Sequence, residues 1–231
     1  GKGYTSARIR SEMSPAPKTL VLLPTELERR RFEELGGLPE GAHALELCGF
    51  GPVAAAARTA ELLARLAPRR VLLVGIAGSY DPLRWPVGGA CWFRACALTG
   101  VGVGEGPGFI DPPALGFPQW PGESLGRGSP RIENQLPLWV PEPGPRCAAT
   151  LLTTCAASAT PAQVAERRRR FPAADAEDME GFAVATACAL AGVPLAIVRG
   201  LSNVVGDRDP KRWRIQGALE TARALALEAL A

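Results

Sequence analysis

The 231-residue sequence contains a single histidine, His43. Neither a catalytic triad that uses histidine as its base nor a metal site built from several histidines is therefore expected. The net charge is only +3, and no apolar run reaches the roughly 18 to 20 residues that cross a bilayer. We expect no metal or other cofactor, no nucleic-acid partner and no membrane association. Chemistry must rest on carboxylates, amides and backbone groups.

The cysteines also lack a functional spacing. All six are scattered, and no pair has the close spacing of a zinc knuckle or a redox motif. Several lie within apolar strand or helix patterns, which predicts reduced, buried thiols in a cytoplasmic protein. They are Cys48, Cys91, Cys96, Cys147, Cys155 and Cys188.

The chain divides into a short polar start and one long globular part. Residues 1–17 are polar and lack the apolar core of a signal peptide, which predicts a flexible N-terminal segment. Met13 is a candidate natural start, which would make residues 1–12 an addition. Because 47% of the chain is hydrophobic, residues 18–231 can bury one large core, and we expect a single domain.

Strand and helix patterns alternate along most of the chain. Thr25 and Glu28 have the spacing of a capping box, which predicts the start of the first helix. The alternation predicts an α/β fold whose parallel or mixed sheet is covered on both faces. The strands expected are 19–23, 43–48, 71–75, 148–154 and 195–198, and the helices are 25–35, 53–66, 161–170, 182–191 and 211–231. Residues 101–145 are dense in glycine and proline, and we expect them to form loops over a binding site.

Two polar pairs stand at the edges of one predicted α/β unit. Met179-Glu180 precedes a helix, and Ser202-Asn203 follows an apolar strand. Ligands collect at the carboxyl ends of strands in such sheets. A glutamate can accept hydrogen bonds from two vicinal ribose hydroxyls, and a methionine offers the sugar an apolar surface. Asn203 has a donor and an acceptor in one plane, which matches N7 and the 6-substituent of a purine. The pairs predict a nucleoside site.

Each of these residues also has an ordinary structural explanation. Glu180 alone is typical of an acid at a helix start, and Asn203 alone of a turn after a strand. The glycine loops 49–51 and 75–78 are too short for a dinucleotide fingerprint or a P-loop. The basic run 167–170 is best explained as a solvated helix end. The combination of the two polar pairs favours a ligand-binding site over these separate explanations.

Five motifs in this order resemble the purine nucleoside phosphorylase and nucleosidase superfamily, and the layout is most similar to its hydrolytic methylthioadenosine/S-adenosylhomocysteine nucleosidases. They are Thr25-Glu26-Leu27-Glu28, Gly49-Phe50-Gly51-Pro52-Val53-Ala54-Ala55, Val74-Gly75-Ile76-Ala77-Gly78, Asp178-Met179-Glu180-Gly181 and Arg199-Gly200-Leu201-Ser202-Asn203. The resemblance covers residues 18–231, with a poorly matched middle. It implies a three-layer nucleoside phosphorylase/hydrolase-like fold, with a central mixed β-sheet flanked by helices.

The resemblance also implies roles for individual residues. Glu28 falls where these nucleosidases keep the carboxylate that orients and deprotonates the attacking water. Met179 and Glu180 fall on the ribose-binding pair. The loop beside the sugar and base corresponds to Ile76, Ala77 and Gly78, and Ser202 lies beside the base position.

Asn203 departs from the family pattern. It falls on the acid that protonates N7 in adenine-specific members, and an amide cannot be a true general acid. Because asparagine donates without ionising, it suits a 6-oxo purine. The aromatic pair that clamps the base is replaced in the stretch 153–158, which leaves Phe109 as the candidate stacking residue.

The segment after Asn203 resembles nucleosidases whose substrate carries a benzoate on its 5′ side. Such a group calls for a cationic or aromatic partner, and Arg208 and Trp213 are the candidates. Each has a structural alternative. Arg208 would instead pair with Asp207 or Asp209, and Trp213 would seat the last helix.

These residues predict an enzyme that hydrolyses the N-glycosidic bond of a purine nucleoside through an oxocarbenium-like transition state. A phosphorylase is the alternative on the same scaffold, but Glu28 would repel its phosphate. A non-catalytic nucleoside sensor is a further alternative, suggested by the missing acid. We expect a homodimer or a larger homo-oligomer.

Overall fold

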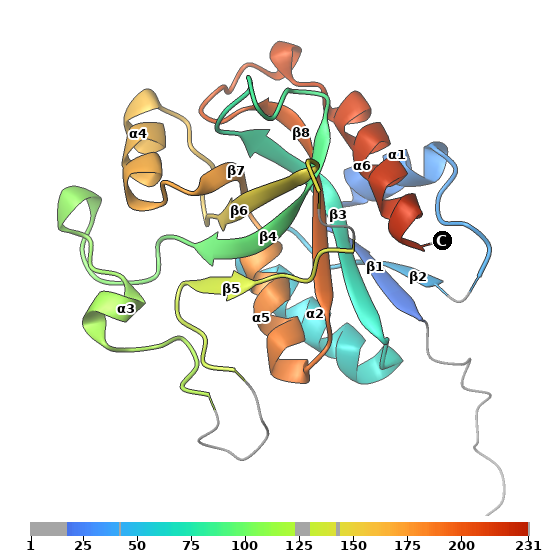
Figure 1. The fold of residues 1–231 in the computed structure, drawn as a ribbon, viewed down its shortest axis with the longest axis horizontal. Helices are drawn as coiled ribbons and strands as arrows, with labels where there is room; N and C mark the ends of the chain where they lie inside the picture. Colours follow the sequence, from blue (N-terminus) through green and yellow to red (C-terminus); the bar gives the residue numbers. More distant parts are fainter. Residues whose placement is uncertain (1–17, 42, 123–129, 142–143, 231) are drawn as a thin grey trace, which may run out of the picture.

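The computed structural model describes residues 18–41, 43–122, 130–141 and 144–230 (Figure 1). The flexible segment predicted for residues 1–17 lies outside them, and the single domain predicted for the rest stays a prediction. No helix in the described ranges is long and apolar enough to cross a membrane. None of the cysteines forms a disulfide there, and all are buried except Cys155, which the sequence did not single out as exposed.

Strands and helices alternate along the described chain, but the strands at 90–98, 135–137 and 174–178 were not predicted. The strands are β1 (Thr19–Leu23), β2 (His43–Leu47), β3 (Arg70–Ser79), β4 (Ala90–Leu98), β5 (Gln135–Pro137), β6 (Cys147–Thr153), β7 (Ala174–Asp178) and β8 (Leu195–Val204). The helices are α1 (Glu26–Glu34), α2 (Pro52–Leu66), α3 (Pro112–Leu115), α4 (Pro161–Arg170), α5 (Gly181–Ala191) and α6 (Ile215–Leu230). Short 3₁₀ turns lie at η1 (Gly106–Gly108) and η3 (Pro210–Arg212).

The strands form one mixed sheet that closes on itself. β3 pairs with β8 in parallel and with β7 in antiparallel orientation. β8 continues to β4, then β6, and β6 pairs with β7, so the ladder returns to β3. β1 pairs with β3 on the edge opposite β8, and β2 pairs with β1. β5 lies beside β4. β3 is therefore the strand on which the sheet branches.

Helices cover the sheet on two sides, which confirms the three-layer fold. In β1, Leu20 and Leu22 pack in the cluster that contains residues of α2 and α5. Val21 and Leu23 pack in the cluster that contains residues of α1 and α6. Figure 1 shows these two helix pairs on opposite sides of β1 and β3. A strand buried on both faces needs apolar residues at successive positions, as β1 has.

Three boundaries differ from the sequence prediction in ways that affect the site. β3 runs on to Ser79 and β8 to Val204, so Ile76–Gly78 and Ser202–Asn203 lie within strands and not in loops after them. Pairing with neighbouring strands holds these polar or glycine-rich ends extended. The last helix begins at Ile215 and not at Lys211, because the preceding residues form the separate turn η3.

Candidate functional site

A cavity of about 360 Å³ lies where the carboxyl ends of β3, β7 and β8 meet the start of α1. Its walls include every predicted site residue except Phe109. Those that line it are Glu28, Ile76, Ala77, Gly78, Met179, Glu180, Ser202, Asn203 and Arg208. The fold thus brings together residues that are far apart in the sequence.

Glu28 belongs both to the start of α1 and to the cavity wall. Its Oε2 accepts hydrogen bonds from the Thr25 amide at 3.1 Å and the Thr25 hydroxyl at 2.6 Å, which completes the capping box. Its Oε1 accepts a bond of 3.0 Å from the Ile76 amide on β3. Burial raises the pKa of Glu28, which is only 4% exposed. These donors hold a carboxylate in one orientation, as a general base requires.

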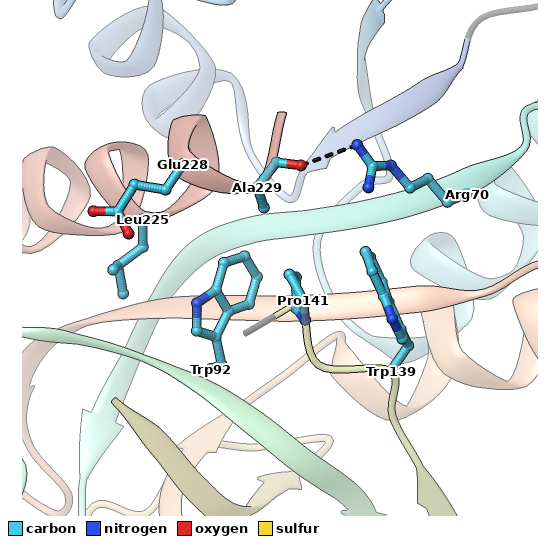
Figure 2. A pocket seen from close by; sticks show the side chains of 7 residues that line it. All are labelled: Arg70, Trp92, Trp139, Pro141, Leu225, Glu228 and Ala229. Atoms are coloured by element: carbon cyan, nitrogen blue, oxygen red, sulfur yellow. Dashed lines mark hydrogen bonds between the residues drawn. The ribbon is translucent and has the colours of Figure 1, made fainter. Parts of the chain in front are cut away.

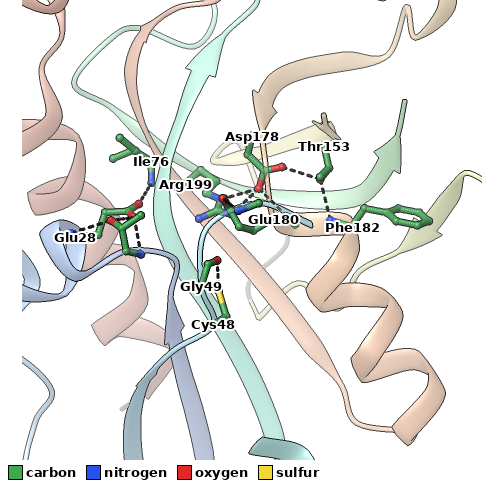
Figure 3. Close-up of polar contacts among 12 residues, drawn as sticks. Glu28, Cys48, Gly49, Ile76, Thr153, Asp178, Glu180, Phe182 and Arg199 are labelled. Atoms are coloured by element: carbon green, nitrogen blue, oxygen red, sulfur yellow. Dashed lines mark hydrogen bonds and ion pairs between the residues drawn. The ribbon is translucent and has the colours of Figure 1, made fainter. Parts of the chain in front are cut away.

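Glu180 directly precedes α5, and its side chain lines the cavity; Figure 3 shows it beside Arg199. Its Oε1 accepts a hydrogen bond of 3.0 Å from the Gly51 amide, and its Oε2 lies 3.5 Å from Nη2 of Arg199. Burial raises the pKa of Glu180 to about 7, against the opposing charge of Arg199. The side chain therefore changes its charge near neutral pH.

Arg199 is the site residue that the sequence prediction missed. It is fully buried on β8, and its Nε donates to Asp178 at 3.2 Å. Asp178 also accepts from the Thr153 hydroxyl at 2.7 Å and the Gly181 amide at 2.9 Å. A lone charge directly after four apolar strand residues was the available signal, because a buried guanidinium needs acidic partners.

Arg199 and Glu28 approach one another across Gly75. A Cβ on Gly75 would overlap Nη1 of Arg199 and lie 2.8 Å from Oε1 of Glu28. Nη1 has no hydrogen-bond partner among the described residues. A donor of Arg199 and an acceptor of Glu28 thus lie close together at a strand position where a side chain on residue 75 would not fit.

Ser202 and Asn203 form the opposite wall. The Ser202 hydroxyl lies 2.8 Å from Oδ1 of Asn203 and donates to it, and Nδ2 of Asn203 donates to the Val204 carbonyl at 2.9 Å. The Asn203 amide group therefore has its oxygen toward Ser202 and its nitrogen on the other side. An amide so held can present a donor to a ligand.

Arg208 and Trp213 stand at the rim of the same cavity. The Arg208 guanidinium lies 5.0 Å from the centre of the Trp213 ring, and Trp213 donates from Nε1 to the Asp207 carbonyl at 3.1 Å. Arg212, and not Arg208, pairs with Asp207 and Asp209. Within the described ranges Arg208 has no carboxylate partner, so the structural alternative considered for it does not hold.

Phe109 and the glycine-rich middle do not lie over this cavity. No described residue between 101 and 145 lines it. The Phe109 ring instead packs under the Arg170 guanidinium, 4.1 Å away, at the end of α4. A bridge between Val103 and Ile110 closes this segment on itself. The predicted stacking role of Phe109 and the predicted loops over the site are therefore corrected.

A second cavity, of about 410 Å³, lies at the other end of β3 (Figure 2). Arg70 begins β3 there, with its guanidinium 5.5 Å from the Trp139 ring and its Nη2 donating to the Ala229 carbonyl at 2.9 Å. Among the described residues that line it the acid is Glu228, which is half exposed and pairs with Arg146 at 2.6 Å, so none of them is a buried carboxylate.

Comparisons with known proteins match this geometry. Residues 145–231 match the family model described as the phosphorylase superfamily. The chain is 37% identical to a futalosine hydrolase of Streptomyces coelicolor over 213 residues, covering 89% of this chain and 82% of the relative. It is 36% identical to a futalosine hydrolase of Thermus thermophilus over 223 residues, covering 89% and 92%.

Solved structures share the fold at lower sequence identity. A 5′-methylthioadenosine/S-adenosylhomocysteine nucleosidase of Neisseria meningitidis, in complex with methylthio-immucillin-A, superposes with a TM-score of 0.71 at 20% identity, covering 92% of this chain and 98% of that one. A futalosine hydrolase of Helicobacter pylori gives 0.70 at 15% identity, covering 93% and 97%.

The solved structures show the fold of nucleoside phosphorylases and nucleosidases, and the relatives at 30% identity or more place the chain in that class. The sequence identity to the two futalosine hydrolases, over most of both chains, narrows this class to one family. The chain belongs to the futalosine hydrolase family of the phosphorylase superfamily. The superfamily resemblance inferred from the five motifs is thereby confirmed.

Proposed function

We propose that this chain hydrolyses the N-glycosidic bond of futalosine, which releases hypoxanthine and dehypoxanthine futalosine in menaquinone biosynthesis. The observation that carries the proposal is the pair of buried carboxylates, Glu28 and Glu180, in one cavity with a buried guanidinium between them. It is further supported by the relatives that are futalosine hydrolases.

The carboxylates divide the work between water and sugar. Glu28 accepts a proton from the attacking water, and the hydrogen bonds from Thr25 and Ile76 hold its carboxylate in place. Ionised Glu180 accepts hydrogen bonds from the ribose hydroxyls beside Met179. As the bond to the base lengthens, positive charge develops on the sugar, and the fixed negative charges around it lower the barrier.

Asn203 contacts the base as it leaves. Its amide donates to the purine as negative charge accumulates there, and the Ser202 hydroxyl fixes its orientation. Because the amide does not ionise, the proton that N7 gains comes from solvent. A 6-oxo purine suits this donor better than a 6-amino purine.

The 5′ substituent reaches the rim at Arg208. An arginine without a carboxylate partner, stacked on Trp213, offers charge and an aromatic surface to a benzoate. This is the feature that favours futalosine over inosine or methylthioinosine, which carry no anion there.

Three alternatives are less well supported. A phosphorylase would have to place phosphate among the acids that line the cavity, namely Glu28, Glu177, Asp178 and Glu180, and the charge of Arg199 is already balanced by Asp178 and Glu180. A nucleosidase for a 6-amino substrate would use an acid at position 203. A sensor without turnover would not require the raised pKa of Glu28.

We further propose that the protein works in the cytoplasm as a homodimer or a larger homo-oligomer, without a cofactor. The absence of a disulfide among the described residues suits a reducing compartment.

Incubation with futalosine, its 6-amino analogue, inosine and methylthioinosine, with and without phosphate, tests the reaction. We expect free hypoxanthine and free sugar from futalosine at the highest rate, independent of phosphate. Sugar 1-phosphate formed only with phosphate would identify a phosphorylase. Binding without release of base from any of the four would identify a sensor and contradict the proposal.

A further inference from the structure

We propose that Glu177 is a specificity-determining residue, whose carboxylate accepts a hydrogen bond from the ring N–H at position 1 of a 6-oxo purine. The inference rests on the proposed function, because it assumes that a purine occupies the cavity beside Asn203. Glu177 is a buried acid that the reaction described above leaves without a role.

Sheet register places Glu177 and Asn203 on either side of a glycine. Gly78 on β3 is the direct partner of Glu177 on β7 and of Asn203 on β8. The register of β3 and β8 shifts after Ala77, and this irregularity is what brings Asn203 opposite Gly78. Directly paired residues project to the same face of a sheet. Glu177 and Asn203 therefore project to one face, on either side of Gly78.

That face is the cavity. Glu177, Gly78 and Asn203 all line it, and Glu177 is 6% exposed. A Cβ at Gly78 would lie 3.0 Å from Val205 and 3.5 Å from Nδ2 of Asn203. The Val205 side chain lies over Gly78 and also lines the cavity, so a flat base would pack beside Val205, with an acceptor at one edge of the ring and a donor at the other.

Four groups fix the Glu177 carboxylate. Oε2 accepts from the Tyr80 hydroxyl at 2.6 Å, the Ser158 hydroxyl at 2.8 Å and Nη1 of Arg167 at 2.8 Å. Oε1 accepts only from the Ser158 amide, at 2.6 Å. A carboxylate oxygen can accept more than one hydrogen bond, so Oε1 retains acceptor capacity. The Arg167 ion pair keeps the group an acceptor and not a donor.

The chemistry of the purine ring explains the selectivity. A 6-oxo purine carries a hydrogen on N1, whereas a 6-amino purine presents a lone pair there. The carboxylate bonds the first and repels the second, and an unpaired buried acceptor would add to the cost. Asn203 and Glu177 then read opposite edges of the same ring system, and each favours the 6-oxo form.

Calorimetric binding of free bases to the full-length protein tests this reading without requiring turnover. The wild type should bind hypoxanthine at least tenfold more tightly than adenine, and more tightly by a similar factor than 1-deazahypoxanthine, which has C–H in place of N1–H. Glu177→Gln should narrow the preference for hypoxanthine over adenine by roughly tenfold, because an amide can also donate to N1 of adenine. Glu166→Gln, the same change on the surface of α4, should leave it unchanged.

The outcomes separate the possible roles. Equal weakening of both natural bases in Glu177→Gln would mean that Glu177 only positions the loop at Ser158, and the proposal would fail. Equal binding of hypoxanthine and 1-deazahypoxanthine by the wild type would also overturn it, even if the variant did not fold. If the wild type discriminates as expected but cleaves no nucleoside, the proposed hydrolysis fails and the role of Glu177 stands.

Discussion

β3 begins in one cavity and ends in the other, and the two differ in a way that volume does not predict. The cavity at Arg70 is the larger, at about 410 Å³ against about 360 Å³. Its charged groups are satisfied by a carbonyl, an aromatic ring and an exposed ion pair. The cavity at Gly78 is lined by several buried acids, one of them beside an arginine donor that has no partner in the described part of the chain.

The contrast shows what marks a candidate active site in this fold. Burying a charge costs free energy unless partners compensate it, so a protein keeps charges inside only where packing or chemistry requires them. The site end of β3 collects charges from α1, β7 and β8 within reach of one another. The opposite end collects apolar and aromatic side chains. The predictions below test whether this difference in buried charge corresponds to a difference in function.

Glu28→Gln should have the largest effect, a loss of roughly 10³-fold or more in kcat with substrate affinity almost unchanged. Glutamine also occupies the last position of capping boxes, so the start of α1 should survive. The matched control is Glu228→Gln, the same change in the larger cavity, which should leave kcat/KM at the wild-type value. Equal losses in the two variants would remove the functional distinction between the cavities.

Glu180→Ala should reduce kcat/KM by roughly 10²- to 10³-fold, because it removes the ribose contact and an oriented charge near the cationic sugar. Steady-state kinetics with futalosine measures the loss. If affinity and rate both persist, Glu180 serves only as the acid at the start of α5.

Asn203→Asp should change the choice of base by roughly 10- to 100-fold. A carboxylate beside a 6-oxygen adds repulsion and removes a donor, whereas it can accept from a 6-amino group. The ratio of kcat/KM on futalosine and its 6-amino analogue measures the change. A parallel loss on both substrates would assign Asn203 a structural role.

The effect of pH on kcat/KM should be smaller and more gradual than the effects of these substitutions. Because the pKa of Glu180 is about 7, the group is protonated below that pH and loses the charge it needs. We expect kcat/KM to decline as pH falls through about 7, approaching tenfold per pH unit below it. In Glu180→Gln the acid limb near pH 7 should be lost, because an amide does not titrate. A wild-type profile that stays flat between about pH 5 and 8, from two units below the Glu180 value to one unit above it, would contradict this role of Glu180.

Local sequence patterns predicted part of this structure, and the rest depends on pairing between strands that are far apart in the sequence. The capping box predicted where Glu28 lies, since its partners are within one turn of helix. The apolar run 195–198 predicted the strand that leads to Asn203, whereas β7 before Glu180 contains three acids among its five residues and was not predicted. Arg199 was not, because its role depends on acids contributed by other strands. Glu177 likewise acquires its position only through the register of β7 with β3.

The stacking role predicted for Phe109 was wrong for a related reason. The choice of a stacking residue depended on where a glycine-rich segment of weak local preference would pack, and its contact with Arg170 on α4 is not encoded nearby in the sequence. Glycine and proline patterns predict that a segment turns, but not which surface it covers.

The branching of the sheet at β3 also has a consequence for folding. Residue 78 meets residue 177, and Val71 to Ser79 pair with Leu195 to Val204. As the chain leaves the ribosome, β3 pairs early with β1 but keeps its other edge open until β8 is made. Such late, long-range pairing slows folding, and an open apolar edge can pair with another chain. The strand that assembles the site is therefore also where we expect an incomplete chain to aggregate.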